Sequence, residues 1–331
     1  MGAATGIVAT GSYLPRRVVT NDEIAARLDV TPEWIERKTH IRSRRFAAPE
    51  EAASDLAVRA ARAALENSGI PLERLGYLVV ATSTGDHPQP PTSYLVQHAL
   101  GAHDIACFDI NVVCSGFVYG LQLARGLLAL HPDRLAMVIG VDVYSRVLDF
   151  ADRRTAVLFA DGAGAAILGA VPDPYGVVDV DLISRGDAHE LIRVEAGGSR
   201  RPASPETLAE GAHFFRMNGR AVRDFVNENL PTALRDLVKR SGVTLDQVDH
   251  FVPHQANGVM LNEIVETTGL TSATTHRTVE RFGNVGSASL PVTLDHANTT
   301  NQLGDGDLVL LSGFGGGMSI GSALLRWTTV R

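Results

Sequence analysis

The stretch SGIPLERLGYLVV, residues 68–80, returns in altered form as SGVTLDQVDHFVP, residues 241–253. Each copy predicts the end of a helix with glycine at its C-cap, a short connection and then a strand. The same offset aligns NVVCSGFVYGL (111–121) with NVGSASLPVTL (284–294), and RLAMVIG (134–140) with DLVLLSG (307–313). Three matches at one offset predict two copies of one α/β unit, the alternative being that generic α/β units look alike.

We therefore divide the chain into an N-terminal half, residues 1–173, and a C-terminal half, residues 174–331. Apolar strands expected at Leu78–Ala81, Ala136–Gly140 and Leu308–Ser312 alternate with helical patterns, which predicts an α/β fold with sheets covered by helices. Sites commonly lie where two such units meet. We expect Cys114 to face residues 254–284 across this junction, within about 15 Å.

The composition narrows the class of protein. The 331 residues carry a net charge of −7, which argues against a nucleic-acid or anionic-membrane surface. Two cysteines, Cys107 and Cys114, exclude a disulfide framework and a multi-cysteine zinc site, and suit a reducing cytoplasm. We expect no signal peptide, and no membrane span because no run of about 18 apolar residues is evident. Residues 183–215 predict an extended loop or insertion that could cover a site.

Cys114 lies where a strand pattern, ACFDI (106–110), gives way to a helix pattern. At a helix N-terminus, unpaired N–H groups and the helix dipole stabilise a thiolate, so we expect a lowered pKa for the Cys114 thiol. From this stretch alone, a buried and inert cysteine is an equal alternative. Cys107, within the strand, is expected to be such a residue.

A nucleophilic cysteine needs a histidine and groups that stabilise an oxyanion. His254, in DHFVPHQANGVM, follows a predicted strand, and a helix is expected to start around Ala256; a structural histidine is the alternative. Asn284, in RFGNVGSASLP, takes the slot of Asn111 in the repeat; a turn or capping role is the alternative. Three consecutive glycines, Gly315–Gly317, would let backbone N–H groups approach a ligand.

The glycine-rich segments GFGGG (313–317) and FADGAGAAILG (159–169) fit neither G-x-G-x-x-G nor G-x-x-x-x-G-K-[ST], so no dinucleotide or phosphate loop is predicted. FADGAGAAILG instead predicts a tight turn between two strands, packed against close backbone.

Together these motifs resemble the β-ketoacyl-acyl-carrier-protein synthase III family of the thiolase superfamily. The resemblance covers nearly the whole chain, and its strength lies in the order and spacing of the motifs. They are GSYLP (11–15), EWIERKTHIRSRR (33–45), CSGF (114–117), ADGAGAA (160–166), VPHQAN (252–257), GNVGSAS (283–289) and GFGGG (313–317). The resemblance implies a thiolase-like fold, two duplicated α/β halves forming a five-layered αβαβα sandwich, and a cytoplasmic homodimer.

The resemblance also implies an acyltransferase of the EC 2.3.1 type. Cys114 would accept an acyl group from acyl-CoA, and the backbone N–H groups of Cys114 and Gly316 would form the oxyanion hole. His254 and Asn284 would bind a malonyl thioester, usually on an acyl carrier protein, and stabilise the enolate formed on decarboxylation. That carbanion would attack the acyl-cysteine. No metal or redox cofactor is implied.

Further substrate contacts follow from the same resemblance. Trp34 would stack on CoA, and Arg153 would pair with a phosphate of CoA. The alternatives are a core tryptophan and a solvated arginine. Asn257 would contact substrate. Gln89 takes the place where many relatives have a phenylalanine that reaches into the acyl pocket of a second subunit.

Several residues depart from the family pattern. Val259 and Asp224 take positions where fatty-acid members carry basic residues that dock the carrier protein, although Arg220 and Arg223 are near, and Lys38 and His40 replace an arginine and a glycine. We therefore expect an acyl group or acceptor other than acetyl-CoA with malonyl-carrier protein, in a polyketide or other secondary pathway.

Two alternatives remain open. In one, the acyl group passes from Cys114 to a hydroxyl or amine without condensation, and His254 acts as general base. In the other, the chain is an inactive scaffold partner. Asn284 favours condensation, because an enolate needs the second donor. A thiolase is disfavoured because residues 313–317 supply no second cysteine.

Overall fold

The computed structural model describes residues 4–329, whose main feature is a pair of five-stranded sheets. The first has the order β1-β7-β6-β4-β5, formed by β1 (Ala4–Tyr13), β4 (Leu75–Ala81), β5 (Ala106–Ile110), β6 (Leu135–Val143) and β7 (Asp161–Val171). The second has the order β12-β11-β13-β14-β8, formed by β8 (Gly176–Ser184), β11 (His250–Pro253), β12 (Thr274–Thr275), β13 (Leu308–Gly315) and β14 (Ser319–Arg326). The strands expected around 78–81, 136–140 and 308–312 are therefore present.

The two sheets have the same topology when they are read from opposite ends. β4 pairs in parallel with β5 and β6, as β11 does with β12 and β13. The remaining pairs are antiparallel: β7 pairs with β1 and β6, and β14 pairs with β13 and β8. The division proposed after residue 173 falls in the turn between β7 and β8.

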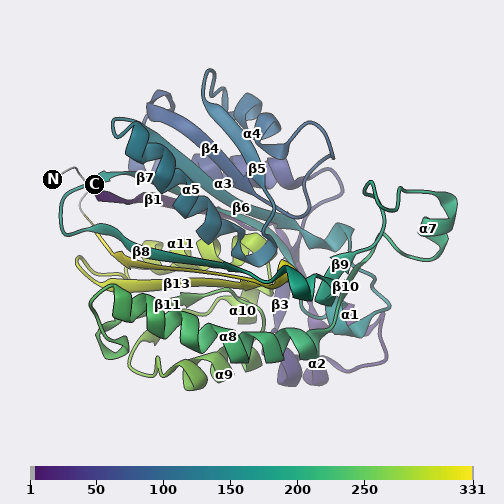
Figure 1. The fold of residues 1–331 in the computed structure, drawn as a ribbon. Helices are drawn as coiled ribbons and strands as arrows, with labels where there is room; N and C mark the ends of the chain where they lie inside the picture. Colours follow the sequence, from purple (N-terminus) through teal and green to yellow (C-terminus); the bar gives the residue numbers. More distant parts are fainter. Residues whose placement is uncertain (1–3, 330–331) are drawn as a thin grey trace.

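Helices complete five layers, α on β on α on β on α (Figure 1). One outer layer is α3 (Ala53–Ser68) with α4 (Thr92–Leu100), which pack on the first sheet. The other is α8 (Gly219–Arg240) with α9 (Gly258–Thr268), whose apolar side chains share a core with the second sheet. Between the sheets lie α5 (Gly116–Leu130) and α11 (Ser289–Thr299). The predicted αβαβα sandwich is confirmed.

The central helix α5 contacts both sheets. Its buried Phe117 and Leu121 share one apolar core with Val79 of the first sheet and Val309 of the second. The prediction that no apolar run of about 18 residues is present was wrong: residues Val113–Leu130 are long and apolar enough to cross a membrane, by length and composition only. In this fold they form the middle layer, because their apolar face is the surface on which both sheets pack.

Short elements connect the layers. They are β2 (Arg17–Thr20), α1 (Asn21–Ala25), α2 (Pro32–Thr39), β3 (Ser43–Phe46), η1 (Leu72–Arg74), η2 (Val113–Ser115), η3 (Tyr144–Arg146), α6 (Arg153–Ala156), η5 (Leu245–Gln247), α10 (Val279–Phe282), η6 (Gly286–Ala288) and η7 (Gly316–Met318), where η marks a 3₁₀ helix.

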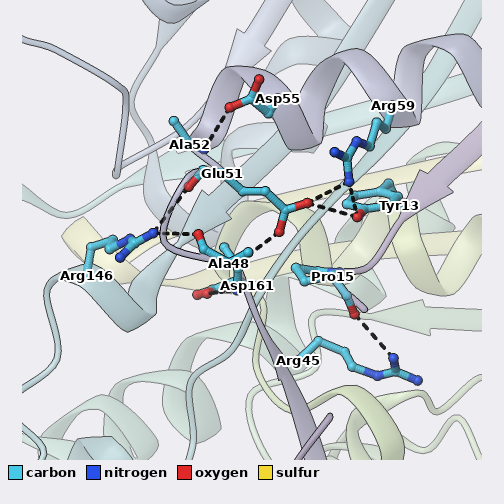
Figure 2. Close-up of polar contacts among 11 residues, drawn as sticks. Tyr13, Pro15, Arg45, Ala48, Glu51, Ala52, Asp55, Arg59, Arg146 and Asp161 are labelled. Carbon is cyan, nitrogen blue, oxygen red and sulfur yellow. Dashed lines mark hydrogen bonds and ion pairs between the residues drawn. The ribbon is translucent and has the colours of Figure 1, made fainter. Parts of the chain in front are cut away.

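The loop between β3 and α3 is tied to η3 by polar contacts (Figure 2). The Glu51 carboxylate accepts from the Ala48 N–H at 2.8 Å and from the Tyr13 hydroxyl at 3.0 Å, and it pairs with Arg59 at 2.6 Å. The Arg146 guanidinium donates to the carbonyl of Ala48 at 2.7 Å. These bonds fix η3 in place, which matters because η3 supplies one wall of the cavity described below.

Of two predictions about irregular segments, one was wrong and one was incomplete. Residues 161–169 of FADGAGAAILG lie in one continuous strand, β7, rather than in a turn, although the segment does meet close backbone: a Cβ on Gly164 would lie 2.7 Å from the Val292 nitrogen. Residues 183–215 contain η4 (Gly186–Leu191), β9 (Ile192–Val194) and α7 (Pro205–Ala209), and β9 pairs with β10 (Phe215–Met217). These elements are too short to show a period in the sequence. The α7 segment projects from the body of the molecule (Figure 1).

Candidate active site

Cys114 lies on the 3₁₀ turn η2, immediately before α5, rather than within the helix itself. Its side chain is buried, 6% exposed. The preceding Val113 has a φ of +46°, an uncommon conformation for a branched residue, and this turn places the sulfur beside the glycine run that follows β13. Cys107 lies within β5, as expected, but it is half-buried rather than buried.

The prediction of a lowered pKa for Cys114 was wrong. The pKa of the thiol is raised to about 12: burial is the largest cause and the charge of Asp142 adds to it, whereas the backbone N–H groups of Gly316 and of Cys114 itself act in the opposite direction. The N–H groups that motivated the prediction are therefore present, but desolvation outweighs them. The resting residue is a neutral thiol with two backbone donors at its sulfur.

His254 follows β11 and is 2% exposed. Its backbone N–H donates to the Ser312 carbonyl at 2.7 Å, and its ring meets the Phe314 ring edge-on, with centroids 5.4 Å apart. Burial lowers the pKa of His254 to about 3, so the ring is neutral at physiological pH. Within residues 4–329 the buried Nδ1 has no hydrogen-bond partner.

The helix after His254 begins two residues later than predicted, at Gly258. Asn257 is its N-cap, and its side-chain oxygen accepts from the Met260 N–H at 2.9 Å.

Asn284 is held at both its backbone and its side chain. Its N–H donates to the Leu158 carbonyl at 2.9 Å, and its carbonyl accepts from the Ala160 N–H at 2.8 Å. Its side-chain oxygen accepts from the Gly286 N–H at 3.0 Å. Because the oxygen is engaged, the amide NH₂ is the end of the side chain that can act as a donor toward a ligand.

Cys114, His254 and Asn284 line the same cavity, together with Gly315 and Gly316. The structure therefore brings the two halves together as expected from the repeat. The remaining walls are apolar apart from one hydroxyl: Val113, Tyr144, Phe159, Ile192, Phe215, Met217, Val222, Ala256, Met260 and Phe314.

Sequence reasoning missed most of these walls. Three rings close one side, with centroids 4.6 Å apart for Tyr144 and Phe159, and 4.8 Å for Phe159 and Phe215. Ile192 and Met217, from the β9–β10 pair, complete that side. The expectation that residues 183–215 could cover a site was thus the one usable signal, although it named no residue.

Trp34 and Arg153 lie together on the surface, the guanidinium 5.7 Å from the ring centroid. Trp34 is half-buried and Arg153 exposed. Neither lines the cavity. Gln89 is exposed on the loop before α4 and does not line this chain's own cavity either. Within residues 4–329 no group of three or more His, Cys, Asp or Glu side chains is arranged to hold a metal ion.

Two family models match the sequence: 3-oxoacyl-[acyl-carrier-protein] synthase III over residues 108–186, and the C-terminal part of the same family over residues 238–327. The acetoacetyl CoA synthase NphT7 of Streptomyces sp. (strain CL190) is 50% identical over 323 residues, which cover 97% of this chain and 98% of that protein. The β-ketoacyl-[acyl-carrier-protein] synthase III of Symbiobacterium thermophilum is 42% identical over 322 residues, with coverage of 97% and 98%. The crystal structure of the priming β-ketosynthase from the R1128 polyketide biosynthetic pathway superposes with a TM-score of 0.91 at 31% identity, covering 99% of this chain and 97% of that one.

Proposed function

The chain belongs to the 3-oxoacyl-[acyl-carrier-protein] synthase III family, and on that premise we propose that it condenses an acyl-CoA with a malonyl thioester on Cys114. The observation that carries the proposal is the convergence of Cys114, His254 and Asn284 on one largely apolar cavity. Such a cavity excludes water, so its few donors act strongly on developing negative charge.

In the first half-reaction the Cys114 sulfur attacks the acyl-CoA carbonyl. The C–S bond to CoA breaks, and the thiol proton leaves with the CoA sulfur. The backbone N–H groups of Cys114 and Gly316, which already point at the sulfur, are the donors for the tetrahedral oxyanion. The neutral resting thiol means that the proton must move during the attack.

In the second half-reaction the malonyl carboxylate leaves as CO₂, and the resulting enolate oxygen is held by His254 and Asn284. A neutral imidazole carries one N–H donor, and the Asn284 amide supplies the second, since its oxygen is engaged by Gly286. The carbanion attacks the acyl-cysteine carbonyl, the C–S bond to Cys114 breaks and a β-ketoacyl thioester forms. The released Cys114 sulfur takes up a proton from solvent, which restores the thiol.

The charges near α9 favour a malonyl group carried by CoA over one carried by an acidic carrier protein. Arg223, exposed on α8, is paired with Glu263 of α9 through two contacts of 2.6 and 2.7 Å. Asp224 beside it is also exposed, and residue 259 is a valine. Arg220, one turn earlier on α8, is also exposed, but Asp224 and the Glu263 that pairs with Arg223 offset the two arginines, so this surface offers little net positive charge to an acidic partner. The Trp34–Arg153 pair, in contrast, offers an aromatic face and a cation to a nucleotide.

A panel of acyl-CoAs incubated with the protein, followed by intact mass measurement, tests the first half-reaction. We expect a stable acyl adduct that Cys114→Ala abolishes and Cys107→Ala retains. An enzyme that forms no adduct with any thioester would be a scaffold rather than a synthase.

Malonyl-CoA and malonyl-carrier protein, added separately to the acylated enzyme, test the second half-reaction. We expect CO₂ and a β-ketoacyl product from malonyl-CoA, with the higher kcat/KM. Transfer of the acyl group to a hydroxyl or amine without CO₂ would instead indicate a simple acyltransferase, and a preference for the carrier protein would overturn the choice of CoA.

We also propose that the protein acts as a cytoplasmic homodimer and needs no metal or redox cofactor. Support for a dimer comes from the end strand β5, whose Phe108 and Ile110 are only half-buried, and from Tyr94 on neighbouring α4, which is 52% exposed. A second copy on this edge would receive the loop that carries Gln89. Light scattering should give twice the mass of the 35.3 kDa chain.

A further inference from the structure

Asp142 is a fully buried carboxylate at the end of β6, outside the catalytic set. Its Oδ1 accepts from the N–H and the hydroxyl of Ser83, each at 2.9 Å, and from the Thr84 hydroxyl at 2.9 Å. Its Oδ2 accepts from the N–H of Ser287 at 2.7 Å and from its hydroxyl at 2.8 Å. The carboxylate thus joins the loop after β4, in the first half, to η6 in the second.

Ser287 takes the slot of Cys114 in the repeat, and Asp142 takes the slot of Gly315. At the reactive turn, Gly315 leaves room beside the thiol, and a Cβ there would lie 3.6 Å from the sulfur. At the other turn a carboxylate fills the equivalent space and binds the serine. The two equivalent turns therefore differ: the turn with Cys114 is open beside the sulfur, whereas the turn with Ser287 is held by Asp142, which we call the anchor of that turn.

The contact between Asp142 and Ser287 lies three residues along the chain from Asn284, a donor of the active site. Ser287 is bonded to Asp142, the adjacent Gly286 packs on the same carboxylate, and the Gly286 N–H holds the Asn284 side-chain oxygen. A displacement of η6 would therefore turn the Asn284 amide away from the cavity.

We propose that Asp142 is a positioning residue for Asn284, and that it serves the malonyl half-reaction and not the acylation of Cys114. This rests on the proposed function. A misplacement of about 1 Å in such a group can lower a rate about 100-fold. Acylation depends on the sulfur and on N–H groups of η2 and η7, to which Asp142 makes no hydrogen bond. The charge of Asp142 raises the pKa of the Cys114 thiol, so its removal should not slow this step.

The test separates the two half-reactions in Asp142→Asn by rapid quench and intact mass. We expect acetyl-CoA to acylate Cys114 within about threefold of the wild-type rate, while malonyl-CoA consumes the adduct at least about tenfold more slowly. Asp161→Asn is the matched control, because Asp161 is an equally buried carboxylate that binds Ser145 and the Ala47 N–H but, within residues 4–329, makes no hydrogen bond to η6. Its ratio of the two rates should stay at the wild-type value.

Equal slowing of both steps in Asp142→Asn, or no slowing of either, would overturn the proposal. If that variant does not fold, Gly286→Ala decides, since it displaces the same loop from the other side and should show the same selective loss. Failure of the wild type to form any acyl adduct would refute the proposed function itself, a result that none of these variants can produce.

Discussion

Gly286→Ala should destabilise the protein by much more than its backbone conformation alone explains. Gly286 is buried with a φ of +58°, a region that costs an L-residue about 1–2 kcal/mol. A Cβ there would also lie 2.3 Å from the Asp142 Oδ2 and 2.4 Å from the Tyr144 Cε2. Both neighbours are buried and bonded, so relief requires η6 to shift, and overpacking of this kind costs about 1–3 kcal/mol more. We expect the free energy of unfolding to fall by about 2–4 kcal/mol in total. This figure allows for the lower conformational entropy that alanine gives the unfolded chain.

Gly69→Ala isolates the backbone part of this loss. Gly69 has a φ of +66° at the end of α3, and a Cβ there would meet nothing within 4 Å. Its substitution should cost about 1 kcal/mol in urea unfolding followed by circular dichroism, compared at equal m-value. The difference between the two variants measures the close contact of η6 with Asp142 and Tyr144. If Gly286→Ala cost no more than Gly69→Ala, that contact would be wrong, and the positioning argument would fail with it.

Three further outcomes follow from the site. Because the pKa of His254 falls to about 3 in the folded protein, only the unfolded chain protonates this imidazole as the pH drops from 7 to 5. The free energy of unfolding should therefore fall by about 2 kcal/mol over this range. In His254→Gln, urea unfolding should show a pH dependence that is smaller by this amount. Arg153→Ala should raise the KM for acyl-CoA about two- to fivefold, through loss of the cation beside Trp34, without changing the rate with an acyl-pantetheine that lacks the nucleotide. Phe215→Leu should open the aromatic wall and shift the ratio of acylation rates from acetyl-CoA toward hexanoyl-CoA; an unchanged ratio would show that this wall does not contact the acyl chain.

Local signals in the sequence predicted sheets covered by helices and three catalytic candidates, whereas the five layers followed from the family resemblance. Leu78–Ala81 is an apolar run buried on both faces, and Gly69 stands in the left-handed conformation that ends α3, as the repeated SG pairs indicated. The repeat also located Cys114 and Asn284 in corresponding turns, and these do face one cavity.

Properties that depend on packing between distant segments could not be predicted in this way. The pKa of Cys114 is decided by burial among segments from both halves of the chain rather than by the helix that follows it. The wall formed by Ile192 and Met217 comes from a hairpin whose strands have three residues each. Asp142 gave no signal at all, because a single acidic residue after an apolar strand is ordinary until its partner, Ser287, is known.

The duplication explains why one active site is built where two equivalent turns exist. Each turn packs on the glycine of the other half's strand: a Cβ on Gly313 would lie 2.9 Å from the Cys114 carbonyl oxygen, and a Cβ on Gly140 would lie 2.4 Å from that of Ser287. Gly140 and Gly313 are themselves equivalent in the repeat, so the close approach is reciprocal and fixes both turns against the opposite sheet.

The turns differ two residues further along those strands, where the first half has Asp142 and the second has Gly315. A carboxylate at residue 315 would fill the space beside the Cys114 sulfur and raise the cost of forming a thiolate or an oxyanion there. Glycine at residue 142 would leave Ser287 and the Asn284 loop without their anchor. The difference between Asp142 and Gly315, which are equivalent in the repeat, thus accounts for both roles. The turn with Cys114 must stay open, and the turn with Ser287 must stay fixed to position Asn284.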